Sequence, residues 1–549
     1  MSNEAENKVI GLRSLPRRQV VTIMVGVMLA IFLSSLDQTI VGTAMPRIIS
    51  DLGGFSNYTW MTTAYIITSA IAIPITGKLT DMYGRKRFYI IGLTIFTVGS
   101  LLCGLSNTMT QIILFRGLQG IGAGMMMSNA YTVIGDIFPP AERGKYQGIV
   151  SAVFAVASVI GPLLGGFLTD NLSWHWIFFV NVPLGVFVIL LFTFRFPDIR
   201  PQGSQHRVDY AGAGTLVLTV VPLLLALSWG GVEYPWSSAP IITMLILSGV
   251  MASLLVRIEG RNPEPIIPMW LFRNRIVGMS NVAIFLTAFG MFGGIIFVPL
   301  FFQGVLGASA SASGTFLTPM MLGIAAGSFI SGQLISRTGG HYRIQGAIGI
   351  AVMASGMALL SRMTAETTYT TAVANVVTLG FGLGTIMPLF SIIVQNAVPY
   401  NMLGVASSSV PFMRSVGGSV GLAIFGSILN NRFASDLAGR LPAALKSLIP
   451  QDQLAFITKN PQVLVSPESQ AQLRSALEQL GPQGNTIYDQ VIHAVREGLA
   501  FALSQVFLVG FLVALAALVI HLFIPQIRLR KQHVLSDVPS RLNATDGNS

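Results

Sequence analysis

Residues 77–87 read GKLTDMYGRKR and lie between two long apolar runs. This stretch concentrates one acidic and four basic residues in a chain with few charges, and Gly77 and Gly84 bracket Asp81. Glycines at these positions are typical of a tight turn whose backbone closely approaches a neighbouring helix. We therefore interpret 77–87 as a short cytoplasmic link between two membrane helices.

This link has two possible roles. A plain positive-inside loop would explain its bases alone, but not an acid at the membrane boundary or the spacing of the glycines. A latch between helices would explain both, because an acid beside bases at a helix end needs a partner. We favour a conformational latch built from Gly77, Asp81, Gly84, Arg85 and Lys86.

The composition is that of a polytopic membrane protein. Hydrophobic residues make up 52% of the 549 residues and charged residues only 10%, whereas a soluble domain has about 25% charged residues. The formal net charge of +11 comes from bases in short links between apolar runs, which is the positive-inside pattern. We therefore expect a lipid bilayer, and no nucleic acid, around this chain.

The sequence lacks the patterns of an enzyme or a metal site. Cys103 is the only cysteine, and no Cys/His group has metal-ligand spacing. The phosphate-binding pattern G-x-x-x-x-G-K-[ST] is absent. We expect no catalytic residues, no metal and no cofactor, which argues against an ATP-driven pump.

Apolar runs long enough to cross a bilayer recur along the chain. Because their number is even, both termini lie on the same side of the membrane. At about 20 residues per span, we expect about fourteen membrane helices, at roughly 19–42, 58–78, 88–107, 110–134, 147–168, 177–196, 209–229, 238–257, 276–299, 312–335, 344–363, 369–396, 405–429 and 499–524.

The basic residues identify that side as the cytoplasm. They gather in both termini and in the links after the second, fourth, sixth, eighth and tenth spans, while the opposite links carry little charge. Cytoplasmic loops are enriched in Lys and Arg. Segment 430–498 is basic in places yet lies outside, but segments longer than about 60 residues escape this rule.

Segment 430–498 is predicted to lie on the outer face without spanning the membrane. Ser466, Pro467 and Glu468 form a helix start, leucines at helical spacing follow, and Gly481 ends the helix. This segment is either a small cap on the outer mouth or a docking surface for a partner in the envelope.

An internal repeat divides the chain into two halves. Residues 332–339, GQLISRTG, follow the tenth span as 77–87 follows the second, but Ser336 replaces Asp81. Two parallel halves around a central cavity are typical of a secondary transporter. The predicted parts are a cytoplasmic N-terminus (1–18), an N-terminal six-helix half (19–196), two inserted spans (209–257), a C-terminal six-helix half (276–524) and a cytoplasmic tail (525–549).

Asp37 and Arg116 lie deep inside predicted spans. An intramembrane charge costs at least about 2.5–3.5 kcal/mol on insertion scales, so its presence indicates a function. A carboxyl group that is dry in one state and hydrated in another can bind and release protons, as coupling to a proton gradient requires. Arg116 cannot carry the proton, because its guanidinium stays charged. The alternative is a purely structural pair.

The fifth span ends in GPLLGG at 161–166. Proline and paired glycines form a bendable packing face, which predicts a role for Gly161, Pro162, Gly165 and Gly166 in motion between helices. Ordinary close packing of membrane helices explains the same residues, and the two interpretations are compatible.

A third deep charge, Arg414, has no obvious acidic partner in its half of the chain. It either contacts a polar or anionic part of a substrate or extends toward the cytoplasm. Methionine and phenylalanine side chains supply soft, adaptable apolar surface. Our candidates for the lining of a substrate cavity are Gln119, Met291, Phe292 and Arg414.

In these motifs the chain resembles the major facilitator superfamily, and most closely its fourteen-span drug:proton antiporters of the EmrB/QacA type. The resemblance covers roughly residues 20 to 525 and rests on several motifs together. They are LDQTIVGTAMP at 36–46, the link at 77–87, LFRGLQGIGAG at 114–124, GPLLGG at 161–166 and WHWIFFVNVP at 174–183.

The resemblance implies export of hydrophobic or amphiphilic drugs across the cell membrane (plasma or inner), driven by the proton gradient, through alternating access. Asp37 would be the proton site and Arg116 its partner. Residues 161–166 would mark an antiporter.

The resemblance also assigns partners to the latch. Asp81 would hold the outward-open state by facing the N-terminal end of the thirteenth span near Gly404, where the helix dipole favours negative charge. Arg85 would pair with Asp136 at the cytoplasmic end of the fourth span.

The chain departs from the family pattern in places. Gly42 stands where the family usually has Asn, His175 stands where it usually has Arg, and spans nine to twelve hold no acid in their apolar interior. Similar exporters of multivalent organic cations tend to use additional membrane carboxylates. We therefore expect substrates that are apolar, neutral or singly charged amphiphiles.

Other hypotheses remain open. An exporter of lipids or other endogenous amphiphiles would have the same fold, with 430–498 receiving the lipid. A substrate:proton importer is disfavoured by the motif at 161–166. A structural or receptor role would leave the buried Asp37 unexplained.

Overall fold

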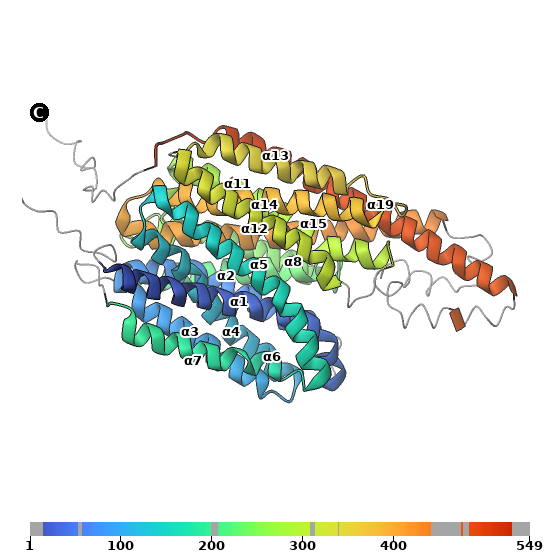
Figure 1. The fold of residues 1–549 in the computed structure, drawn as a ribbon, viewed down its shortest axis with the longest axis horizontal. Helices are drawn as coiled ribbons and strands as arrows, with labels where there is room; N and C mark the ends of the chain where they lie inside the picture. Colours follow the sequence, from blue (N-terminus) through green and yellow to red (C-terminus); the bar gives the residue numbers. More distant parts are fainter. Residues whose placement is uncertain are drawn as a thin grey trace, which may run out of the picture.

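The computed structural model describes residues 15–52, 58–198, 207–307, 313–338, 340–440, 474–475 and 482–529. In this part of the chain the regular structure is helical (Figure 1), and the β-pairing is one isolated bridge between Gly230 and Tyr234. Thirteen helices within these ranges are long and apolar enough to cross a membrane. The predicted all-α, polytopic fold class is confirmed at this level.

The N-terminal half is a bundle that runs from Arg17 to Arg195. Its sixth predicted span is broken at Val180 into a single turn and a longer helix. The helices are α1 (Arg17–Leu52), α2 (Tyr58–Tyr83), α3 (Arg85–Gly104), α4 (Met109–Ile137), α5 (Pro140–Asn171), α6 (Trp176–Phe179) and α7 (Asn181–Arg195).

Helix α4 has the predicted position but is not among the thirteen candidate spans. Its sequence contains Arg116, Gln119, Asn129 and Asp136, which lower its hydropathy, and all four are buried. Both α2 and α3 pack extensively against α4, so protein rather than lipid surrounds these polar side chains. The total of fourteen spans remains a prediction.

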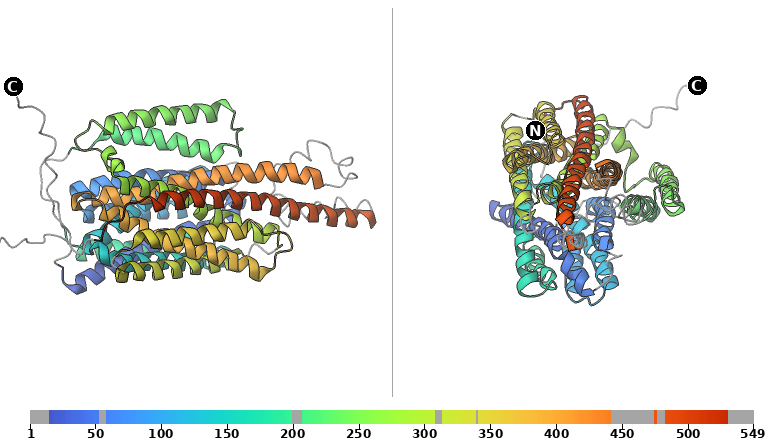
Figure 2. Two further views of the ribbon diagram at one scale, coloured as in Figure 1. Left: turned by 90° about the horizontal axis from the view of Figure 1, so that it is seen from above. Right: turned by 90° about the vertical axis from the view of Figure 1, so that its right-hand side faces the viewer.

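The inserted pair forms a hairpin of α8 (Tyr210–Trp229) and α9 (Ala239–Glu259). Figure 2 shows this hairpin along one side of the bundle, where α8 contacts α2 and α15. The C-terminal half consists of α10 (Met269–Arg273), α11 (Arg275–Gly304), α12 (Ser313–Thr338), α13 (Tyr342–Leu360), α14 (Tyr369–Asn396), α15 (Leu403–Arg440) and α19 (Pro482–Leu522).

The two halves repeat the same helix packing. In the N-terminal half α1 packs on α5, and α2 and α3 pack on α4; in the C-terminal half α11 packs on α15, and α12 and α13 pack on α14. The contact between the halves is also paired, with α5 against α12 and α15 against α2. The repeat inferred from 77–87 and 332–339 therefore extends over whole bundles.

Glycines set the close approaches within each half. A Cβ on Gly120 of α4 would lie 2.4 Å from the carbonyl oxygen of Tyr65 on α2, and one on Gly380 of α14 would lie 2.3 Å from that of Met320 on α12. Backbones this close exclude any side chain. Gly124 and Gly384 repeat the arrangement one turn later.

Segment 430–498 differs from the predicted separate cap at both of its edges. Helix α15 continues to Arg440 and α19 begins at Pro482, so these helices extend well beyond the predicted spans 405–429 and 499–524. Between the extensions, Arg440 forms ion pairs with Asp436 and Glu497, and Phe433, Leu437, Val491 and Val495 are buried. The predicted helix start at Ser466–Glu468 and its end at Gly481 lie outside the described residues.

Helix α1 begins and α19 ends at the same end of the bundle (Figure 1). At this end α2 also terminates and α15 starts, and we refer to it as the latch end. The predicted tails 1–18 and 525–549 are described only for 15–18 and 525–529.

Candidate functional site

Asp37 is the centre of a buried polar network in the N-terminal half. Its Oδ2 accepts a 2.6 Å hydrogen bond from Arg116 Nη1, and its Oδ1 accepts from Gln119 Nε2 at 2.8 Å and from Asn181 Nδ2 at 3.0 Å. The exposed fractions are 0% for Asp37 and 2% for Arg116. An ion pair this dry requires such additional hydrogen bonds to offset its desolvation.

Three helices bring these groups together: α1 carries Asp37, α4 carries Arg116 and Gln119, and Asn181 begins α7. Arg116 and Gln119 are three residues apart and so share one face of α4, where Arg116 Nη1 also donates to Gln119 Oε1 at 2.8 Å. The ring of Tyr65 on α2 lies 4.2 Å from the Arg116 guanidinium carbon. The predicted Asp37–Arg116 contact is present.

Gln119 was predicted in a substrate cavity, but both of its polar groups are used in this network. Sequence reasoning missed Asn181, which also donates to Ser100 Oγ at 3.1 Å. The available signal was an amide in the otherwise apolar motif 174–183. That signal does not specify a partner, because Asn181 and Asp37 are 144 residues apart in the sequence.

The latch joins the two halves at the latch end. Asp81 accepts hydrogen bonds of 2.9 Å from the backbone nitrogens of both Gly404 and Val405, in the first turn of α15. A carboxylate at this position satisfies free N–H groups and interacts favourably with the helix dipole. Gly77 lies alongside, and a Cβ there would be 2.7 Å from the Gly404 carbonyl oxygen.

Arg85 connects this carboxylate to a second one. Its Nη2 lies 2.5 Å from Asp81 Oδ1, its Nε lies 2.9 Å from Asp136 Oδ2, and its Nη1 donates to Thr80 Oγ1 at 2.9 Å. The predicted Arg85–Asp136 contact is therefore present. Gly84 allows this geometry because its φ of 94° is strained for other residues.

Lys86, predicted as part of the latch, lies apart from it. Its Nζ donates to the carbonyl oxygen of Thr193 at 2.9 Å, within the last turn of α7. This contact binds α3 to α7 inside one half. The basic residues of 77–87 thus serve at least two separate contacts.

A second contact between the halves was not predicted. Arg143 of α5 donates to Gln395 Oε1 of α14 at 3.1 Å, and Gln395 Nε2 donates to the carbonyl oxygen of Tyr131 on α4 at 3.1 Å. Both side chains are buried. In the sequence, Arg143 was indistinguishable from the other bases that indicated topology.

The glycines of the motif 161–166 differ in their surroundings. A Cβ on Gly161 would lie 2.0 Å from Thr39 Oγ1, and one on Gly165 would lie 2.2 Å from Thr43 Oγ1, both on α1. Gly166 has no described residue within 4 Å of such a Cβ, and α5 continues through Pro162 without a break. Close packing on α1 therefore accounts for Gly161 and Gly165, but not for Gly166.

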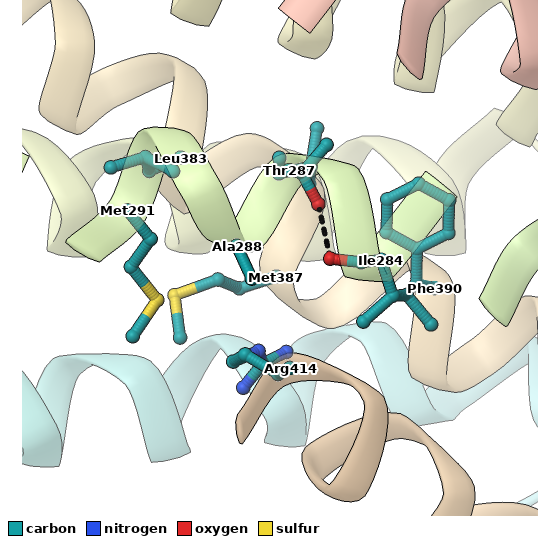
Figure 3. A pocket seen from close by; sticks show the side chains of 9 residues that line it. Ile284, Thr287, Ala288, Met291, Leu383, Met387, Phe390 and Arg414 are labelled. Atoms are coloured by element: carbon teal, nitrogen blue, oxygen red, sulfur yellow. Dashed lines mark hydrogen bonds between the residues drawn. The ribbon is translucent and has the colours of Figure 1, made fainter. Parts of the chain in front are cut away.

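Arg414 of α15 lines a pocket in the C-terminal half (Figure 3). The cavity volume of this pocket is about 20 Å³. Predicted cavity residue Met291 also lines it, whereas Phe292 packs against Gly418 instead. The remaining lining residues come from α11 and α14: Ile284, Thr287, Ala288, Leu383, Ile386, Met387 and Phe390.

Comparison with known sequences identifies relatives along most of the chain. The pattern of the Major Facilitator Superfamily matches residues 27–209 and 210–422. The multidrug transporter protein MdtP of Bacillus subtilis is 40% identical over 518 residues, which cover 92% of this chain and 93% of that protein. Multidrug resistance protein 3 of the same species is 40% identical over 415 residues, 76% of this chain and 80% of that protein.

Comparison with solved structures identifies the same fold. The human organic anion transporter MFSD10 (TETRAN) has a TM-score of 0.58 and 13% sequence identity, and the match covers 91% of this chain and all of that one. At this level of identity the likeness concerns the arrangement of helices alone.

Proposed function

This chain belongs to the major facilitator superfamily and is a multi-pass, non-enzymatic membrane transporter of the drug efflux type, and we propose that it is a proton-coupled exporter of hydrophobic or amphiphilic small molecules. The coupling rests on one observation above all. Asp37 is completely buried among three donors, in a position from which only a rearrangement of helices can expose it to water.

Alternating access supplies that rearrangement. The contacts of Asp81 with Gly404 and of Arg143 with Gln395 cross between the halves at the latch end, so this conformation has its latch end closed. If that end faces the cytoplasm, the conformation is outward-facing or occluded. Breaking these contacts would open the cytoplasmic side and let Asp37 exchange its proton there.

The repeat supports different binding functions for the two halves. Gly161 and Gly165 pack on Thr39 and Thr43 as Gly417 and Gly421 pack on Phe285 and Phe289. By this correspondence, Ala283 of α11 occupies the place of Asp37 on α1. The N-terminal half would therefore bind the proton, and the C-terminal half would bind substrate at the Arg414 pocket.

The remaining features follow from this function. We assign α4 as a further membrane span, which brings the total to fourteen. We also assign both termini to the cytoplasm and the protein to the cell membrane. The proton gradient would supply the energy for transport, and no cofactor would be needed. The extensions of α15 and α19 would project from the outer face, where an envelope partner or a cap formed by 430–498 would lie.

Reconstituted vesicles test the proposal. The purified protein is incorporated into liposomes with a fluorescent amphiphile outside and a pH gradient across the membrane. Accumulation of the amphiphile should follow the gradient and stop when a protonophore collapses it. Accumulation that ignores the gradient, or that is unchanged by Asp37→Asn, would contradict proton coupling.

A further inference from the structure

Arg414 differs from the other buried arginines of the bundle interior. Within the described residues, Arg116, Arg85 and Arg143 each have several hydrogen-bond acceptors, whereas Arg414 has neither a hydrogen bond nor an ion pair. Its side chain is half-buried and lies against a pocket. A guanidinium has five N–H donors, so this group is available to a ligand.

Among the residues that the structure describes, the surroundings of Arg414 supply no counter-charge. Every other side chain that lines the pocket is uncharged, and Thr287 uses its hydroxyl to donate to the Ile284 carbonyl oxygen at 3.1 Å in its own helix. Asp37, the deep acid of the sequence, is fully engaged in the other half. An unpaired charge in the interior of a membrane protein is costly, and an anion from outside the chain would compensate it.

We propose that the Arg414 pocket binds the anionic group of amphiphilic substrates, so that the exported class is organic anions with one carboxylate-like group on an apolar body. This inference rests on the proposed export function. A planar guanidinium binds a carboxylate through two parallel hydrogen bonds. The substrate's apolar body would lie against Met291, Met387 and Phe390.

Figure 3 shows how the pocket divides these tasks. Arg414 lies on one side, on α15, and the methionine and phenylalanine side chains of α11 and α14 lie across from it. Flexible thioethers adapt to apolar groups of different shape, which suits a site for varied substrates. In this conformation the pocket has a cavity volume of about 20 Å³, which is room for about one water molecule, so the helices that line it have to separate before a substrate can occupy it.

The charge is specific to one half. Gly417 and Gly421 of α15 correspond in their packing to Gly161 and Gly165 of α5, and by the same correspondence Ser158 stands in the place of Arg414. The anion would therefore bind in the C-terminal half, away from Asp37 in the N-terminal half. Proton and substrate would not compete for a single side chain.

A matched pair of fluorescent probes tests the assignment by equilibrium binding, without a gradient. The probes are 11-(dansylamino)undecanoic acid, which is ionised at neutral pH, and its methyl ester, which has the same apolar body without the charge. The full chain is held in nanodiscs of phosphatidylcholine, which has no net charge. We expect the acid to bind about tenfold or more tightly than the ester, as a charge-assisted hydrogen bond implies.

Substitutions locate the preference. Arg414→Gln should abolish the difference between acid and ester, and Arg414→Lys should retain part of it. Arg275→Gln, at an exposed position, should leave the difference unchanged and controls for loss of one positive charge. Asp37→Asn should also retain the preference, because it lies in the other half.

Equal affinity of wild-type protein for the two probes, or no measurable binding of either, would overturn the inference. So would a preference that persists in a monodisperse Arg414→Gln protein. Failure of proton coupling has a different signature. It would appear as gradient-independent transport in liposomes while the preference for the acid and its dependence on Arg414 remain.

Discussion

Arg143 of α5 donates a hydrogen bond of 3.1 Å to Gln395 of α14, and this contact joins the two halves of the transporter. Its helices differ from those of the Asp81 contact, which joins α2 to α15. Two separate sets of hydrogen bonds between the halves therefore hold the latch end closed. In one, the carboxylate of Asp81 on α2 accepts hydrogen bonds from the start of α15. In the other, the amide of Gln395 on α14 bonds to Arg143 of α5 and to the backbone of α4.

Gln395→Leu should favour opening of the latch end. The substitution removes two hydrogen bonds between the halves, together worth about 2 kcal/mol, and leaves Arg143 with its carbonyl partners Gly135 and Phe138. Spin labels on the exposed residues Lys145 and Arg337 should report longer distances by electron paramagnetic resonance. Gln345→Leu is the matched control.

The control is informative because, in the described part of the chain, Gln345 donates only to Ser331, within the C-terminal half. Its replacement should leave the distance between the labels unchanged. Equal shifts in both variants would mean that general destabilisation, rather than loss of the contact between halves, causes the opening.

Asp81→Asn should slow transport while substrate affinity is retained. The variant loses the charge that faces the first turn of α15 and the ion pair with Arg85. Favourable charges at helix N-termini contribute about 0.3–2 kcal/mol, so the closed population should fall several-fold. Transport rate in liposomes and probe affinity in nanodiscs measure the two effects separately.

Ser336→Ala provides the symmetric control. Ser336 corresponds to Asp81 in the repeat, but among the described residues its hydroxyl donates only to Gly332 of its own helix. We expect little change in rate. If Asp81→Asn abolished binding but left switching normal, Asp81 would instead belong to the substrate site.

The sequence predicted contacts whose partners are both unusual residues. Asp37 and Arg116 are rare deep charges, so chemistry limits their partners, whereas the partners of Asp81 and Arg85 were implied by the family resemblance. It could not predict the partners of Gln395 or Asn181, because an amide hydrogen-bonds with any polar group. Nor could it assign Gln119, whose position beside Arg116 suits either a cavity or the Asp37 network.

Helix ends were predicted less well than the order of the helices. Apolar runs indicate only the part of a helix that lipid or core surrounds. The extension of α15 to Arg440 packs on α19 and buries the apolar Phe433 and Leu437, but polar residues such as Asn430 and Arg432 interrupt the apolar run there. Similarly, the low hydropathy of α4 reflects polar side chains that other helices cover.

Asn181→Leu should impair proton coupling without preventing folding. It removes one of the three donors to the Asp37 carboxylate, and a hydrogen bond to a charged group contributes about 1.5–3 kcal/mol. We expect weaker dependence of transport on the pH gradient, measured in liposomes. Asn281→Leu is the control, because within the described ranges the Asn281 amide donates only to Val277 in its own helix, and it should leave coupling intact.

Substitution of the glycines in 161–166 distinguishes a role in close packing from a role in bending of α5. In Gly165→Ala the new methyl group would lie 2.2 Å from Thr43 Oγ1 and 2.9 Å from the Ile40 carbonyl oxygen, so α5 must move away from α1. We expect a lower melting temperature and reduced transport.

Gly166→Ala places its methyl group in open space and should be neutral or stabilising by up to about 1 kcal/mol, since alanine favours helix more than glycine does. Loss of transport in a stable Gly166→Ala protein would indicate that this glycine is needed for bending of α5 rather than for close contact, and that the motif acts through motion.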